Sequence, residues 1–339
     1  MASWEVEIAA SHVRVFSAAV QALACVGREI SFTVEAEGAG TAMMLTAMND
    51  NAASFASFRF EPRFFARTRV RRATAISCKV VARALVPALR RATAKAAVRS
   101  RQVAGVMKVV VRHDDDEVSD DDNDELRAPR LVVEVFHEDG IRARWRLFYE
   151  MAEAEDAAFD ERDAGRVSCH PMQLASVFEH VTAHAVEVHV TGEDLGVSSR
   201  AEDDAASTKL KIAKDDLDSL ELPRFESEAA LAFNAKEAKA AVKFCQAADV
   251  SDMTFQFTRA GKPVAFSGRA PSGATARFLI STSRSVRHNN RGPSQRPPSA
   301  SIPSNNQEPA ARCRVDDDDD DDDLPPRRRR RASFIGVYR

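Results

Sequence analysis

The sequence predicts an α+β protein with two similar domains, each holding two helices packed on antiparallel sheets, followed by a disordered C-terminal tail. Two observations lead to this fold class. An amphipathic helix followed by an alternating, strand-like run recurs four times before residue 284. From Arg284 onward the chain is rich in Pro, Ser and Asn and poor in aliphatic residues, so burial cannot offset the entropy of ordering it.

The length and composition agree with this organisation. The chain has 339 residues, of which 44% are hydrophobic, enough for about two domains with apolar cores. The expected boundaries are domain 1 at 1–150, a connector at 151–169, domain 2 at 170–283 and the tail at 284–339. The run from 113 to 127 is acidic, and we expect it to be a solvated loop at a hairpin tip within domain 1.

Each of the four units starts with a helix. The expected helices and the strand runs that follow them are 11–26 with 27–38, 79–98 with 103–113, 170–184 with 185–200, and 234–250 with 251–268. In the first helix we expect Ser11 to be the N-cap. The apolar side chains that share one face of that helix are Val13, Phe16, Val20 and Leu23.

The second and fourth helices separate apolar from basic residues. The apolar side of the second helix is expected to hold Val81, Leu85, Ala88, Leu89, Ala92 and Ala96, opposite Arg83, Arg90, Arg91 and Lys95. Pro87 removes a backbone donor in mid-span, which predicts a kink or a restart. In the fourth helix the lysines Lys236, Lys239 and Lys243 lie opposite Ala238, Ala241, Val242 and Cys245.

Two turn signals mark hairpins. Glu138-Asp139-Gly140 separates two alternating runs between residues 130 and 150, and Ala260-Gly261-Lys262 separates two more near the end of domain 2. The segment between the two domains is acidic and lacks strand character, so it is expected to be the connector. A final strand is expected in the run ARFLISTS, which ends at Ser283.

Positive charge is concentrated in one region. The net charge is only −3, yet the residues from Pro62 to Arg112 include fourteen Lys or Arg and no Asp or Glu. Charge of a single sign repels itself unless a polyanion compensates it, and nucleic acid is the commonest such partner. No base-reading motif is present, which favours contact with the phosphate backbone without sequence preference. The three lysines of the fourth helix alone would fit an ordinary solvated face equally well.

The patterns required by several other functions are missing or incomplete. Neither phosphate-binding glycine motif, GxGxxG or GxxxxGK[ST], occurs. The histidines and cysteine closest in sequence are Cys169, His170, His180, His184 and His189, and only His180 and His184 are placed one helical turn apart, so we expect no metal site. The aspartates at 114–116 and 120–122 fall in the expected loop, which makes a two-metal 3'-5' exonuclease the enzyme-class alternative. We expect no catalysis and no cofactor.

The N-terminus and the cysteines favour an intracellular protein. No apolar run reaches the length of a membrane span, and Glu5 and Glu7 stand where a signal peptide would be basic and then apolar. The five cysteines are scattered, without a CxxC pair, so reduced thiols are expected.

Three stretches resemble a known family: SFASFRFEPRFFARTRV at 54–70, GIRARWRLFYE at 140–150, and residues 241–283 with their FxxxAD helix, GKPVAF turn-strand and closing FLIST strand. They resemble the Rad-nine subunit of the checkpoint clamp, a sliding clamp with the fold of proliferating cell nuclear antigen. The resemblance covers roughly residues 1–283, and the long tail also suits this subunit.

The resemblance implies a function. Rad-nine joins Rad-one-like and Hus-one-like subunits in a heterotrimeric nuclear ring that encircles double-stranded DNA, with helices lining the hole and strands outside. The expected DNA-facing residues are then Arg83, Arg90, Arg91, Lys95, Lys236, Lys239 and Lys243. A clamp loader, a checkpoint adaptor and repair enzymes are implied partners, and the connector with the pocket beside it is the implied docking site. The alternatives are a homotrimeric replication-type clamp and a basic binding module that forms no ring.

The tail departs from the family pattern. The run Asp316–Asp323 has no Ser or Thr beside it, although the family tail carries a serine in an acidic context that recruits the adaptor once phosphorylated. The candidate phosphorylation sites are Ser119 in an acidic context, Ser294 before Gln295, and Ser333 after Arg327–Arg331. The same arginine block matches a nuclear import signal, and it could equally be a partner for the aspartate run.

Overall fold

The structure is a computed structural model of the whole chain, and the parts that it describes are residues 3–37, 40–71, 76–93, 105–114, 130–153, 155–181, 184–200, 207–224 and 226–283. All of these residues fall in one compact unit. The expected tail, with Ser294, Ser333 and the arginine block, lies outside the described residues. So do Ser119 and the acidic run from residue 115 onward.

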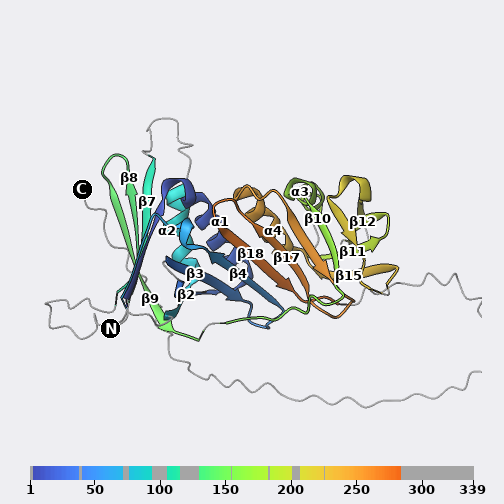
Figure 1. Cartoon of the computed structure of the whole chain (residues 1–339), viewed down its shortest axis with the longest axis horizontal. Coiled ribbons are helices and arrows are strands. Elements are labelled where there is room, and N and C mark those ends of the chain that lie inside the picture. The colour runs from blue at the N-terminus through green and yellow to red at the C-terminus, as the bar shows by residue number, and fades with distance from the viewer. Residues whose placement is uncertain are drawn as a thin grey trace, which may run out of the picture. The chain divides into compact units, whose positions relative to one another are not determined.

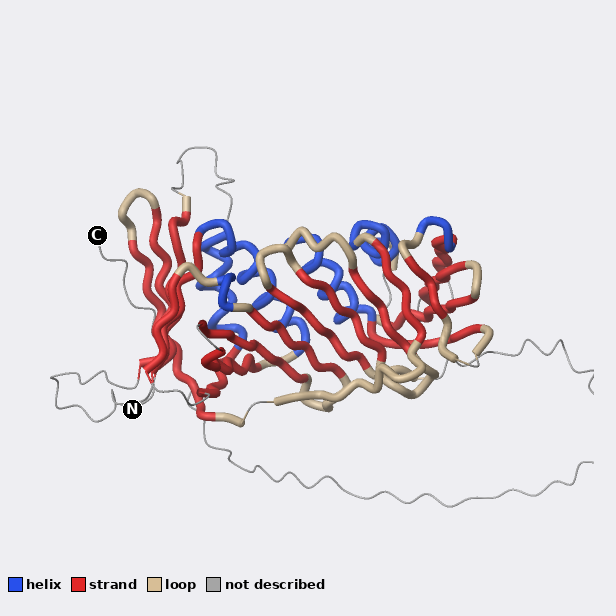
Figure 2. The backbone as a smooth tube through the Cα atoms, viewed as in Figure 1, coloured by secondary structure: helices blue, strands red, loops and turns tan. Residues whose placement is uncertain are grey.

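Four helices pack in a row along one side of a sheet (Figures 1 and 2). They are α1 (Ala10–Val26), α2 (Ala82–Thr93), α3 (Pro171–Glu179) and α4 (Ala235–Ala247). Their spatial order is α2, α1, α4, α3, because α1 contacts both α2 and α4 while α3 contacts α4. Two short 3-10 helices, η1 (Pro62–Phe64) and η3 (Lys214–Asp216), complete the helical elements of the described parts. None of the helices described is both long enough and apolar enough to cross a membrane.

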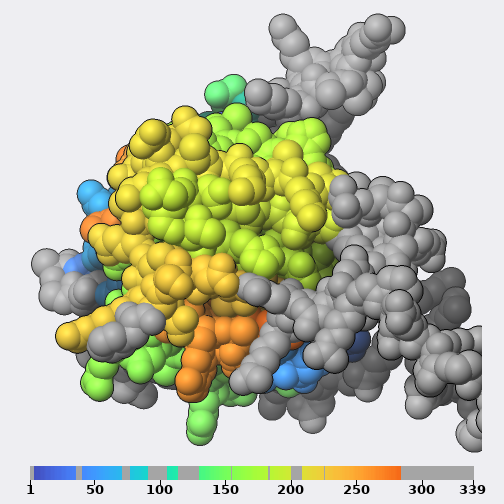
Figure 3. Space-filling view, turned by 90° about the vertical axis from the view of Figure 1, so that its right-hand side faces the viewer, coloured from blue at the N-terminus to red at the C-terminus, as the bar shows by residue number. Residues whose placement is uncertain are grey.

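The strands described form two antiparallel sheets. The larger runs in the order β14 (Ser219–Glu221), β10 (Gly165–Cys169), β16 (Met253–Phe257), β17 (Val264–Arg269), β18 (Ala274–Ile280), β4 (Ser54–Phe60), β3 (Gly40–Met48), β2 (Glu29–Glu37), β6 (Ile76–Val81), β9 (Arg142–Met151), β8 (Arg130–His137), β7 (Val106–Asp114), β1 (Ser3–Ala9) and β5 (Arg67–Arg71). The smaller runs β13 (Ser207–Ala213), β12 (Asp194–Arg200), β11 (Ala185–Thr191), β15 (Glu228–Asn234). Strands β7–β9 lie at the left end of Figure 1, and residues of the smaller sheet, in yellow-green and yellow, cover much of the right-hand end (Figure 3).

The two halves of the chain join in the middle of the larger sheet. Strand β4 of the first half pairs with β18 of the second along its whole length, from Ser54 opposite Ile280 to Phe60 opposite Ala274. Beneath this joint Phe58 is fully buried. The centre of its ring lies 4.6 Å from the ring centre of Phe244 in α4 and 5.5 Å from the ring centre of Phe278 in β18. Sheet and core are therefore continuous across the joint.

The expected apolar faces of the helices are buried. In α1 the side chains of Val13, Phe16, Val20 and Leu23 are at most 3% exposed. In α2 the buried residues of the expected set are Leu85, Ala88 and Leu89, and in α4 they are Ala238, Ala241, Val242 and Cys245. Burial of this apolar stripe is what places each helix on the sheet.

Details at the helix ends differ from the expectations. Strand β1 runs directly into α1, so the N-cap is Ala9 and Ser11 lies inside the helix without capping it. Val81 is the last residue of β6, paired with Glu29 of β2, and is 41% exposed instead of belonging to the apolar face of α2. Helix α2 runs from 82 to 93 as one element through Pro87, without a restart.

Two of the strands in the structure, β1 and β10, were not expected from the sequence. Strand β1 lies between β5 and β7, and its alternating residues Trp4, Val6 and Ile8 are buried. The last five residues of the expected connector form β10, which pairs with β14 and β16, so the extended connector ends before Gly165. His113, assigned to the acidic loop, lies buried in β7.

The predicted hairpins are present. The Glu138-Asp139-Gly140 turn joins β8 to β9, with Gly140 at a φ of 81° that favours glycine. The turn at Gly261 joins β16 to β17, also at positive φ. Each turn therefore has its glycine where the backbone requires one.

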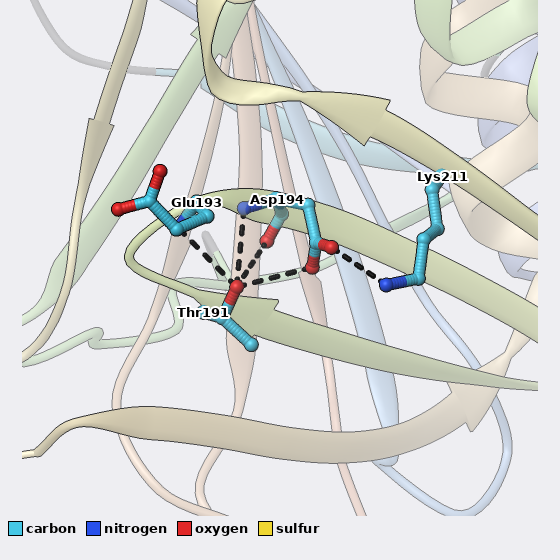
Figure 4. Close-up of polar contacts among 4 residues, drawn as sticks. All are labelled: Thr191, Glu193, Asp194 and Lys211. Carbon is cyan, nitrogen blue, oxygen red and sulfur yellow. Dashed lines mark hydrogen bonds and ion pairs between the residues drawn. The ribbon is translucent and has the colours of Figure 1, made fainter.

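The β11–β12 hairpin is closed by a side-chain network (Figure 4). The hydroxyl of Thr191 accepts hydrogen bonds from the backbone N–H groups of Glu193 and Asp194, at 3.3 and 3.1 Å, and donates to the Asp194 carboxylate at 3.1 Å. Lys211 of β13 donates to the other oxygen of that carboxylate at 2.7 Å. The hydrogen bond from Lys211, assisted by that from Thr191, lowers the pKa of Asp194.

Replacing Asp194 by Asn should reduce stability at about pH 7 by less than about 1 kcal/mol, as is usual for a pair open to solvent. The folded pKa is below the ordinary value of about 3.9, so the stabilisation is complete above that value and is lost as the pH falls through the folded pKa. The difference between the variant and the wild type in urea unfolding should therefore shrink below about pH 4. Glu193→Gln is the matched control, and an Asp194→Asn effect that did not depend on pH would contradict this account.

Candidate nucleic-acid interface

The row of four helices exposes cations on the side opposite its buried stripe. Arg83 and Arg90 of α2 and Lys236 and Lys243 of α4 are all exposed, as the helical spacing predicted. Arg91 also lies in α2, but its side chain is outside the described part of the structure, and Lys95 lies outside it altogether. The structure thus places four of the seven predicted side chains on the exposed surface of two helices.

Lys239 differs from its two neighbours on α4. Its side chain is partly buried, and its Nζ donates a hydrogen bond to the backbone carbonyl oxygen of Val181, just beyond the end of α3. The ammonium therefore fastens α4 to the chain that follows α3. The wheel geometry grouped the three lysines correctly, but only the packing of α3 against α4 shows that one of them has a structural partner.

A further cation on the helix row was missed from the sequence. Arg14 is the only Lys or Arg of α1, and its side chain is exposed. A step of 100° per residue places it far from Val13, Phe16 and Leu23, so the same helical wheel would have found it. It was overlooked because a single cation gives no run of charge.

The fourth helix of the row contributes no cation. Helix α3 contains no Lys or Arg, and its exposed residues include Met172, which is 58% exposed, and Glu179. Positive charge on the row is therefore carried by α2, α1 and α4. A polyanion lying along the helices would be held mainly by these three.

The rest of the basic region is partly compensated within the protein. Four of its side chains pair with carboxylates outside the region, one adjacent in sequence and three distant: Arg63 with Glu61 at 2.8 Å, Arg69 with Glu5 at 3.6 Å, Lys79 with Glu155 at 2.5 Å, and Lys108 with Glu7 at 3.0 Å. The hydrogen bond from Lys79 to Glu155 raises the pKa of Lys79. The absence of acidic residues between 62 and 112 thus overstates the uncompensated charge, because folding brings carboxylates in from β1 and the connector.

Two of the candidate metal ligands, Cys169 and His170, are in environments that do not favour metal binding. Burial raises the pKa of the Cys169 thiol to about 12, so the thiolate that binds metals is disfavoured. The His170 side chain accepts a hydrogen bond from the Met172 backbone N–H and caps α3. No three His, Cys, Asp or Glu side chains among the described residues lie close enough together to hold a metal ion.

The connector lies on the sheet at its joint. Ala157 and Phe159 pack against the apolar cluster of Phe55, Ala265 and Leu279, which belong to β4, β17 and β18. Arg277 of β18 pairs with Glu161 of the connector at 3.3 Å. Beside it is a shallow hollow of about 380 Å³, lined by Phe159, Asp160, Arg162, Asp163, Pro223, Arg224, Glu226, Thr258, Arg259, Lys262 and Pro263.

Comparison with known families agrees with this geometry. A family model described as Rad9 matches residues 16–283, which is most of the chain. The chain belongs to the Rad9 family. This match confirms the Rad-nine resemblance of the sequence. The matched residues include α2, α3, α4 and the part of α1 from Phe16 onward.

Two solved structures of PCNA proteins are similar to this Rad9-family chain. PCNA from Thermococcus kodakaraensis has a TM-score of 0.59 at 13% identity, covering 82% of this chain and 99% of that one. The PCNA2–PCNA3 complex from Sulfolobus tokodaii gives a TM-score of 0.60 at 11% identity, covering 82% of this chain and 98% of that one. No curated protein sequence matches. The family and the fold together make this chain a sliding-clamp-type protein.

Proposed function

We propose that this Rad9-family chain is one subunit of a heterotrimeric checkpoint clamp, which encircles double-stranded DNA and acts as a scaffold without catalysing a reaction. The observation that carries the proposal is the row of helices on one side of the sheet, with exposed cations at Arg14, Arg83, Lys236 and Lys243. A ring needs only weak, sequence-independent contacts to phosphates, because enclosure itself prevents escape.

Free strand edges support assembly into a ring. Along residues 142–148 strand β9 pairs with β8 on one side and with no strand of the described chain on the other. Among the strands that the structure describes, β13 pairs only with β12. These edges belong to opposite ends of the protein (Figure 1), and antiparallel strands of neighbouring subunits could extend the sheet at both ends.

The domain boundaries, the cellular compartment and the loading machinery are proposed from membership of the family. The clamp domains are proposed as 1–150 and 170–283, the compartment as the nucleus, and the loading machinery as a clamp loader. The hollow beside the connector is the proposed docking site for repair enzymes, while the checkpoint adaptor would need another contact, because the aspartate run of the tail lacks an adjacent serine. The exonuclease alternative has no support from the described residues, since its candidate aspartates other than Asp114 lie outside them.

The mass of the purified chain tests the assembly, measured alone and after mixing with the Rad-one-like and Hus-one-like proteins of the same organism. We expect a monomer alone and a one-to-one-to-one complex in the mixture. A stable trimer of the chain by itself would indicate the homotrimeric alternative. A monomer that binds neither partner would contradict the proposed function and leave a basic module that forms no ring.

A further inference from the structure

The helix row, drawn in blue in Figure 2, carries positive charge that the described part of the protein does not pair. Arg14, Arg83, Lys236 and Lys243 are exposed, and none of their side chains has an ion pair or hydrogen bond with a described residue. Helices α1 and α2 contain no Asp or Glu, and the one carboxylate of α4, Glu237, is only 4% exposed. Four cations of the row are therefore open to an anionic partner.

The C-terminal part of the chain leaves the described structure beside this row. The last described residue is Ser283, whose backbone exchanges two hydrogen bonds with Ala232 of β15, at 2.8 and 3.3 Å. Strand β15 runs directly into α4, which begins at Ala235. At about 3.3 Å for each strand residue, the chain departs roughly 10 Å along the strand from the start of α4.

The sequence beyond this point contains a segment of opposite charge. Residues 316–323 are eight consecutive aspartates, and residues 284–315 lie between them and the described structure. The sequence predicts that the intervening segment is disordered, and a flexible chain of that length has a root-mean-square span of about 30 Å. The tether therefore keeps the aspartates near the helix row at an effective concentration on the order of millimolar.

We propose that the run Asp316–Asp323 binds the exposed cations of the helix row and competes there with DNA. Eight successive negative charges offer these cations what a phosphate backbone offers them, without a second molecule. The neighbouring block Arg327–Arg331 has five arginines for eight aspartates, so negative charge remains when the two runs pair with each other. The inference rests on the proposed role of the row in facing DNA, and it adds a segment of the same chain that regulates access to that surface.

Carbodiimide cross-linking of the full chain tests the contact without DNA, because the reagent joins a carboxylate to a nearby lysine amine. In dilute protein, the run 316–323 should be linked to Lys236 and Lys243 about three-fold more often than to Lys262. Lys262 is the matched control, because it is exposed and its carbonyl oxygen accepts a hydrogen bond from the Thr282 hydroxyl at 2.7 Å, beside the start of the tail. Equal linkage to the three lysines would overturn the proposal.

The affinity of the full chain for a labelled duplex of about 20 base pairs tests the competition. Replacing the aspartates at 316–319 by Asn keeps the length of the tail and should tighten binding about five-fold. The control changes four exposed carboxylates on strands and turns to amides, which alters the net charge equally and should leave the affinity within about two-fold. The four are Glu193, Asp215, Asp218 and Glu221.

The two experiments separate failure of this inference from failure of the proposed DNA contact. Equal tightening in both sets of variants would overturn the inference, because total charge would then explain the effect, and so would an affinity that changes in neither. If the wild type and all variants fail to bind the duplex, the proposed DNA contact is wrong. The cross-links alone then decide whether the aspartates occupy the row.

Discussion

Replacing Arg14, Arg83 and Lys243 together by Glu should release duplex DNA from the proposed three-subunit clamp. Each of these exposed residues lies on a different helix of the row. Loss of three phosphate contacts should weaken DNA binding about 100-fold at physiological salt. The slope of log K against log salt should also become shallower, by the amount that about three phosphate contacts contribute. Retention of the complex on closed circular DNA measures the effect. The three-subunit complex should still form, because none of the three side chains lies on a free strand edge.

The matched control reverses three exposed cations on strand β10 and on the turn between β16 and β17, away from the helices: Arg166, Arg259 and Lys262. The net charge changes by the same amount, so any general electrostatic effect is shared. Because these residues do not lie on the helix row, retention should fall far less. Equal loss of DNA in both triple variants would show that total charge, not the helix row, holds the DNA.

Phe58→Ala should have the largest effect on folding. The ring is fully buried where β4 pairs with β18, and it packs against Phe244 and Phe278. Truncation leaves a cavity at the only place where strands of the first and second halves pair in the described larger sheet, and the loss should be about 3–5 kcal/mol in the free energy of unfolding. Urea unfolding of the full chain measures it.

Phe148→Ala is the control for Phe58→Ala, because it removes the same ring from a position that is 63% exposed. Its effect on the free energy of unfolding should stay within about 0.5 kcal/mol. A similar, small effect of both changes would mean that the two halves do not depend on this aromatic contact.

The side of each helix that faces the core was predictable because it depends on local spacing. Residues three and four apart in Val13–Leu23, Leu85–Leu89 and Ala238–Cys245 share one face in any α-helix, whatever the rest of the fold. The two glycine turns were predictable for a similar reason, since positive φ at Gly140 and Gly261 is a local requirement. The position of the cations Arg83, Arg90, Lys236 and Lys243 followed from the same spacing.

The candidate site was less predictable where it depends on partners distant in sequence. Arg14 gave no charge run, and the contact of Lys239 with Val181 depends on how α3 packs against α4. Strand β1 was predictable from its alternation of Trp4, Val6 and Ile8 with Glu5 and Glu7, and only its pairing with β5 and β7 depends on the fold.

By itself, the sequence determined the fold class, the helix faces and the Rad9 relationship, because these depend on periodicity and motifs that short segments carry. Only the tertiary structure decided which basic side chains are paired with carboxylates of the protein itself and which stay exposed to a binding partner. Pairing across the sheet brings Glu5 and Glu7 to Arg69 and Lys108, while the connector brings Glu155 to Lys79. Charge compensation depends on distance in space, and the chain sets that distance only when it folds.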